Sequence, residues 1–199
     1  MKRITALLYH DFTALDALGP LEVLGRLPGY EIRYASLFGG PVSNEKGLVV
    51  MTEALSSPGP GDILLIPGGM GSRQLVLQDD FLAALRKAAL ESTLVMTVCT
   101  GSALAAAAGL LDGLHATGNK KAFDWTMSMG KKVLWQRDVR WTRDGKFYTA
   151  AGVSAGIDMA LGFVADNFGR ERALSLAESM EYGWNERPED GWCFKRQGK

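Results

Sequence analysis

The chain has 199 residues, enough for a sizeable core, and we expect a single domain over residues 1–199 with a polar, aromatic tail from about residue 184. Lysine plus arginine number 22, as do aspartate plus glutamate, so no excess of charge attracts nucleic acid or an anionic membrane surface, and a small molecule is the expected partner. Two cysteines are too few for a disulfide framework or a metal site, and no signal peptide or membrane span is evident, so we expect a cytoplasmic protein without cofactor or metal.

Strand and helix patterns alternate from the first residues. An apolar run over residues 4–9 stops at His10 and predicts a buried strand. A helical pattern then begins near Asp16, whose side chain is either functional or a helix N-cap. Residues 30–38 predict a second strand, and residues 42–53 predict a small hairpin.

A second buried strand, over residues 62–66, ends in the glycine loop that contains Gly68 and Gly69. This loop has neither the G-x-G-x-x-G spacing of a dinucleotide site nor the Gly-Lys-Ser/Thr of a phosphate loop. It is either a place where backbone approaches a small ligand closely or a plain turn. Residues 80–91 then predict an amphipathic helix.

The next strand, which begins at Thr93, stops at Cys99, and a Gly-Ser pair then opens an alanine-rich helix. A sharp turn from strand to helix projects a side chain from the carboxyl edge of a sheet, beside unpaired helix amides that favour a thiolate. We therefore expect Cys99 to be a nucleophile, although a small buried cysteine in a core is the alternative.

The C-terminal half predicts three short strands over residues 133–136, 139–142 and 146–151, with a hairpin turn between the last two. Ser154 is expected to cap a helix over residues 155–168, and residues 170–182 predict another. Strands that alternate with helices in short connections predict an α/β fold with an open, mostly parallel sheet and helices on both faces. Ligands of such sheets bind beyond the carboxyl ends of the strands.

Five segments, taken in order, resemble the motifs of the ThiJ/PfpI superfamily, a flavodoxin-like group with a cysteine nucleophile elbow. They are the segments at residues 16–24, 66–69, 98–102, 109–113 and 152–158. The resemblance covers nearly the whole chain and is specific because all five segments occur in register. It implies a flavodoxin-like fold in which Cys99 is the nucleophile.

Within the superfamily, the setting of Asp16 and the Cys-Thr-Gly-Ser sequence are most similar to isonitrile hydratases, which are lyases. That resemblance implies that Cys99 attacks the terminal carbon of an isonitrile, that Asp16 handles the proton, and that water releases an N-substituted formamide. Thr100 and the backbone amides near Gly69 and Thr100 would stabilise the charged intermediate. The substrate and oxyanion-binding residues would be Gly68, Gly69, Asn119 and Lys120.

One departure from the superfamily is the absence of a histidine where many relatives have Thr-Thr-His-Trp, since this chain has Thr117-Gly118-Asn119-Lys120. His10 could approach the site but is more often structural in such a turn, and His115 is a weaker candidate. Lys120 or Lys121 would lower the pKa of Cys99 or would simply be solvated. An amidase or deglycase is less favoured without the histidine, whereas a ligand or oxidation sensor of the same fold stays a second hypothesis.

The resemblance also implies a homodimer. Four tryptophans in loops, edge strands and the tail are more aromatic surface than such segments usually expose, so we expect some of them in an interface. They are Trp135, Trp141, Trp184 and Trp192, and the alternative is that they cover the core of their own domain.

Overall fold

A computed structural model of the protein describes residues 1–191. In this range the main sheet contains eight strands: β1 (Lys2–Leu7), β2 (Tyr30–Ser36), β3 (Gly40–Ser43), β4 (Val49–Ala54), β5 (Ile63–Ile66), β6 (Leu94–Val98), β9 (Trp141–Asp144) and β10 (Phe147–Ala150). Their order is β3-β4-β2-β1-β5-β6-β10-β9. The strands from β4 to β10 pair in parallel, and only the edge strands β3 and β9 pair antiparallel.

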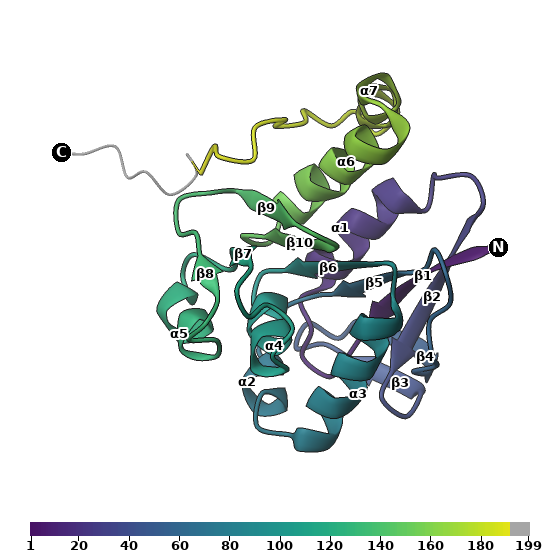
Figure 1. Cartoon of the computed structure of the whole chain (residues 1–199). Helices are drawn as coiled ribbons and strands as arrows, with labels where there is room; N and C mark the ends of the chain where they lie inside the picture. The colour runs from purple at the N-terminus through teal and green to yellow at the C-terminus, as the bar shows by residue number, and fades with distance from the viewer. Residues whose placement is uncertain (192–199) are drawn as a thin grey trace.

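The described chain has seven helices, and six of them cover the two faces of this sheet (Figure 1). They are α1 (Ala14–Leu24), α2 (Ser72–Leu75), α3 (Asp79–Glu91), α4 (Gly101–Ala107), α5 (Phe123–Ser128), α6 (Ala155–Phe168) and α7 (Arg170–Ser179). Helices α1, α6 and α7 lie on one side, and α2, α3 and α4 lie on the other (Figure 1). A small parallel pair, β7 (His115–Ala116) and β8 (Leu134–Trp135), lies beside α5. The predicted flavodoxin-like open α/β sheet is therefore confirmed.

The central strands β5 and β6 are mostly apolar because both faces of the sheet are covered. Every residue of β5 is buried, as are the last four of β6. Strand β1 lies between β2 and β5. The chain therefore adds strands first on one side of β1 and then on its other side, so the strand order reverses at β1. In sheets of this kind ligands bind in the crevice at the carboxyl ends of the strands beside that reversal. The residues that follow β1, β5 and β6 therefore form the expected site.

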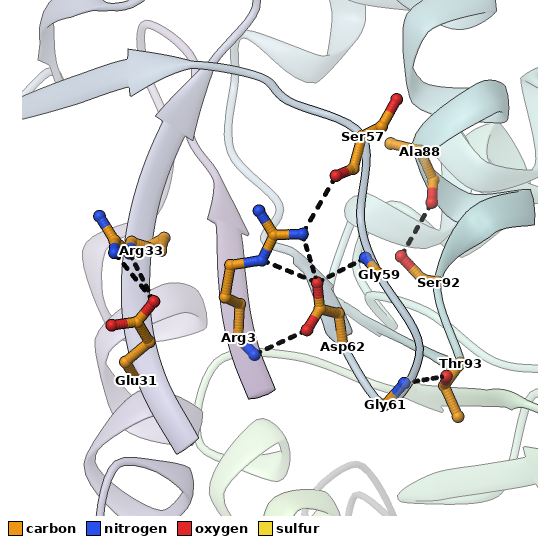
Figure 2. A network of polar contacts seen from close by, with 10 residues as sticks. All are labelled: Arg3, Glu31, Arg33, Ser57, Gly59, Gly61, Asp62, Ala88, Ser92 and Thr93. Carbon is orange, nitrogen blue, oxygen red and sulfur yellow. Dashed lines mark hydrogen bonds and ion pairs between the residues drawn. The ribbon is translucent and has the colours of Figure 1, made fainter. Parts of the chain in front are cut away.

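A polar network fixes the opposite, amino ends of the central strands (Figure 2). Asp62, just before β5, accepts hydrogen bonds from the backbone amide of Arg3 at 2.7 Å and from the Nε of the same arginine at 2.8 Å. The amide of Gly59 also donates to Asp62, at 2.7 Å. These bonds lower the pKa of Asp62, although its partial burial acts in the other direction. They join β1 to β5, the two strands whose carboxyl ends carry Asp16 and Gly68.

The start of α6 differs from its sequence prediction. Ser154 holds the N-cap position, but its side chain makes no capping bond. Its hydroxyl instead accepts from Arg140 at 3.4 Å, and Arg140 forms an ion pair at 2.5 Å with the buried Asp158. Asp158 also accepts from Tyr182 and from the amide of Asn185, so it holds the segment after α7 against α6.

Three of the four tryptophans expected at an interface contact their own chain. Trp141 is 7% exposed and stacks on Tyr148. The indole nitrogens of Trp135 and Trp184 donate to the carbonyls of Gly130 and Asp158. These three residues pack against the core of their own domain, as the alternative expected, and Trp135 and Trp184 are only partly buried there. Trp192 and Cys193 lie outside the described residues.

Candidate active site

Cys99 lies at the turn between β6 and α4, as predicted. Its φ of 60° is in the left-handed region, which is unusual for a residue with a side chain and typical of a nucleophile elbow. The turn is tight, because a Cβ at Gly101 would overlap the carbonyl oxygen of Ile66 at the end of β5. The amide of Cys99 donates to Ala150 at the end of β10, at 3.1 Å. The strained backbone is thus held by β5 and β10 together.

Asp16 is a fully buried residue in the first turn of α1. It is not the helix N-cap, since Thr13 holds that position and accepts from the amide of Asp16. The Oδ2 of Asp16 accepts from the backbone amide of Gly68 at 3.1 Å. Its Oδ1 has no conventional hydrogen-bond partner among the described residues, but the carboxyl interacts with the thiol of Cys99. The alternative that Asp16 merely caps a helix is therefore wrong.

Burial and charge set the protonation of this acid and thiol. Burial raises the pKa of Asp16 to about 7, although hydrogen bonds with Cys99 and Gly68 act in the other direction. Burial, and next the negative charge of Asp16, raise the pKa of Cys99 to about 12. The expectation of a low-pKa thiolate is therefore wrong. At neutral pH the site holds a thiol beside a carboxyl that is close to its own midpoint.

Asn119 contacts the sulfur directly. Its Nδ2 donates to the Sγ of Cys99 at 2.9 Å, and this bond acts to lower the pKa of the thiol. The amide orientation is fixed because Oδ1 accepts from the backbone amides of Lys121 and Ala122, both at 3.0 Å. Where relatives carry a histidine, this chain therefore presents a permanent donor that can stabilise negative charge but cannot accept a proton.

The glycine loop approaches the elbow as predicted, but its amides are already engaged. A Cβ at Gly68 would lie 2.5 Å from the backbone nitrogen of Thr100, so only glycine fits. The amide of Gly69 donates to the hydroxyl of Thr100 at 2.9 Å, and the amide of Gly68 donates to Asp16. The amide of Thr100 donates to the sulfur of Cys99. Among the predicted oxyanion donors, the amide of Thr100 and the side chain of Asn119 therefore face the reacting atom.

Tyr9 is a site residue that the sequence analysis missed. Its hydroxyl donates to the carbonyl of Pro67 at 2.8 Å, and the same peptide unit presents the Gly68 amide to Asp16. Burial, and next the charges of Asp16 and Cys99, raise the pKa of Tyr9, so it stays a neutral donor. No sequence motif marks this contact, since Tyr9 is only the last residue of an apolar run.

The basic and histidine candidates lie farther from the reacting atoms. Lys120 donates to the hydroxyl of Thr117 at 2.6 Å and lies over the ring of Phe123, while Lys121 is exposed. His10 accepts from the amide of Ser43 at 3.3 Å and is exposed. The ring of His115 contacts Asp144 at 3.1 Å.

Two cavities of about 300 Å³ each include site residues such as Tyr9 or Asn119 in their lining, and Cys99 itself lines neither of them. One lies between the ends of β1 and β2 and the α2–α3 region, and its lining includes Tyr9, His10 and Phe81. The other is lined by Asn119 and Gly152, together with Lys120, Lys121, Arg140 and residues 153–155. A Cβ at Gly152 would lie 2.9 Å from the Nδ2 of Asn119 and 3.4 Å from the Sγ of Cys99. The second cavity thus shares two walls with the thiol, and we take it as the candidate substrate site.

Within residues 1–191 no cluster of three histidine, cysteine or carboxylate side chains is arranged to hold a metal ion. None of the helices in this range is long and apolar enough to cross a bilayer.

Residues 2–166 match the DJ-1/PfpI family. Isonitrile hydratase from Pseudomonas putida is 32% identical over 181 residues, which cover 90% of this chain and 78% of that protein. The HTH-type transcriptional regulator GbdR from Pseudomonas aeruginosa is 28% identical over 187 residues, or 88% of this chain, but this chain spans only 49% of the regulator. A ThiJ/PfpI family protein from Pseudomonas syringae, solved by crystallography, has a TM-score of 0.82 at 28% identity and matches over 92% of this chain and 76% of that one.

Proposed function

Since this chain belongs to the DJ-1/PfpI family, as its motifs predicted, we propose that it is an isonitrile hydratase-like lyase that uses Cys99 as nucleophile and Asp16 as proton carrier. The observation that carries the proposal is that Gly68 joins a buried carboxyl to a buried thiol: its amide donates to Asp16 at 3.1 Å, and a Cβ at Gly68 would lie 2.8 Å from the Cβ of Cys99. Burial raises the pKa of this carboxyl to about 7. A carboxyl with such a pKa gains and loses a proton with similar ease at neutral pH, as general acid-base catalysis requires.

The reaction needs no proton from outside the pair until water enters. The sulfur of Cys99 attacks the terminal carbon of the isonitrile while ionised Asp16 accepts the thiol proton. Asp16 then delivers that proton to the same carbon, which gives a thioimidate, R–N=CH–S. Water adds to this carbon, and one of its protons passes through Asp16 to the nitrogen. The carbon–sulfur bond breaks, the second proton returns to sulfur, and R–NH–CHO leaves.

Two donors support the charged states along this path. The side-chain amide of Asn119 and the backbone amide of Thr100 both point at the sulfur, where negative charge develops as the thiol loses its proton. Gly68 holds the carboxylate form of Asp16 in place through its amide. The hydroxyl of Thr100 serves the geometry of the glycine loop.

The experiment that tests the proposal is an assay of the purified protein against aliphatic and aromatic isonitriles, with N-substituted formamide followed as the product. Formation of formamide that depends on Cys99 supports it. Absence of formamide with every isonitrile contradicts the proposal. The resemblance to isonitrile hydratase would then indicate only a shared fold.

A second candidate function is a ligand sensor, which the similarity to the transcriptional regulator favours. Such a domain would bind a small molecule at the same cavity without turnover. An oxidation sensor is less well supported, because Cys99 is 6% exposed and its raised pKa keeps it protonated, and oxidation requires an accessible thiolate.

We further propose that residues 1–199 act as one domain, in the cytoplasm and as a homodimer. Several large apolar side chains other than tryptophan are exposed in the described chain, including Phe38 at 86% and Met51 at 70%. A dimer interface would cover such side chains. Sedimentation at micromolar protein concentration tests the dimer, and a monomer alone would contradict it.

A further inference from the structure

The cavity beside Asn119 and Gly152 is basic as well as adjacent to the thiol. Three of its lining residues are the cations Lys120, Lys121 and Arg140, and no lining residue is a carboxylate. The charge of Arg140 is matched by Asp158, which lies below it in the core. Lys120 donates to the hydroxyl of Thr117, and Lys121, which is exposed, has no ion-pair partner within residues 1–191. The lining of this cavity therefore carries more positive than negative charge, although the whole chain is neutral.

The start of α6 adds to this positive potential. Ser154 and Ala155 line the same cavity, and the side chain of Ser154 caps no amide of the helix. The N-terminus of a 14-residue helix carries a partial positive charge that favours an anion.

The walls of the cavity set where an anion would lie relative to the sulfur. Asn119 contacts the thiol through its side chain and is followed directly by Lys120 and Lys121. All three residues line the same cavity, so a substrate with its reacting carbon at Cys99 could extend through that cavity toward Lys121. Gly152 presents no side chain between the thiol and this space.

From this arrangement we infer that the cavity is a carboxylate subsite and that the substrates are small isonitriles whose carbon chain ends in a carboxylate. The inference rests on the proposed isonitrile chemistry at Cys99. The carboxylate would be held by Lys121 at the rim, beside the start of α6, while the isonitrile carbon faces the sulfur. Charge, rather than apolar bulk, would then select the substrate.

The test compares isocyanoacetate, 3-isocyanopropanoate and 4-isocyanobutanoate with their methyl esters, which keep the skeleton and remove the charge. We expect kcat/KM to favour the best acid over its ester by about tenfold at low ionic strength, since one charge-assisted hydrogen bond contributes at least that factor. Added salt should reduce this preference. Lys121→Gln should bring the ratio of acid to ester close to one, whereas Lys131→Gln, at an exposed lysine outside the cavity, should leave it unchanged. Equal turnover of acid and ester, with no effect of Lys121→Gln, would overturn the subsite and leave the proposed function intact.

A second measurement separates the subsite from the reaction. If neither acids nor esters are hydrated, the proposed function fails, and binding of unreactive butanoate is then measured by isothermal titration calorimetry. Binding to the wild type that is lost in Lys121→Gln supports the subsite without any turnover. No binding at millimolar butanoate overturns it.

Discussion

The side-chain nitrogen of Asn119 lies 2.9 Å from the sulfur of Cys99, where many relatives would place a histidine. Because its Oδ1 is fixed by two backbone amides, Asn119 acts only as a donor to sulfur. Asn119→Ala removes this donor, and we expect kcat/KM for an isonitrile to fall about a hundredfold, as for loss of one oxyanion-hole donor. Asn167→Ala, which removes an exposed asparagine on α6, is the matched control. Unchanged turnover in Asn119→Ala would make this contact structural only.

The left-handed backbone conformation at Cys99 should lower the free energy of unfolding by a measurable amount. Cys99→Ala and Cys99→Gly should both abolish turnover, whereas Cys193→Ala should not. Glycine adopts a φ of 60° without the steric penalty that alanine incurs, so Cys99→Gly should be the more stable variant by about 1 kcal/mol. Urea denaturation measures the difference. Equal stabilities would mean that the elbow stores no strain, and activity in either variant would remove Cys99 as nucleophile.

Tyr9 should set the pKa of Asp16 through one peptide unit. Its hydroxyl polarises the Pro67 carbonyl, which strengthens the Gly68 amide as a donor to the carboxylate. Tyr9→Phe should therefore raise the pKa of Asp16 and move the acidic limb of the kcat/KM profile to higher pH by a few tenths of a unit. Tyr34→Phe on β2 is the control. If the acidic limb of the Tyr9→Phe profile does not move and only the plateau value of kcat/KM falls, Tyr9 contributes through packing and does not set the pKa of Asp16.

Asp16 should also lower stability at neutral pH. Its folded pKa of about 7 lies above the usual value of 3.8, so the folded protein binds the proton more tightly than the unfolded chain does. Stability should therefore fall as pH rises from about 4 to about 7, by at most about 4 kcal/mol, and change little from this group above that range. Asp16→Asn removes the titration. Its free energy of unfolding, relative to the wild type, should increase from pH 4 to pH 7, and a constant difference would contradict the raised pKa.

Local patterns were sufficient to predict the fold and the position of Cys99 at the turn between strand and helix. The strand that ends at Cys99 and the glycine loop at Gly68 are continuous stretches whose composition determines their structure. The direction of the pKa shift at Cys99 was not predictable, because it depends on burial by segments far apart in sequence. The side-chain contact of Asn119 likewise depends on how its amide is turned by its neighbours, and Tyr9 acts through a peptide that only the folded chain brings to it.

The proposed chemistry depends on proton transfer by Asp16, and turnover of an isonitrile by Asp16→Asn is the most direct measurement of that role. The variant keeps the shape of the side chain and an acceptor for the Gly68 amide, so the fold should persist, which circular dichroism checks. General acid-base assistance is worth about 10²- to 10⁴-fold, and we predict that kcat/KM for formamide production falls at least about a hundredfold. Wild-type turnover by Asp16→Asn would contradict the account, since the proton would then have to come from another group.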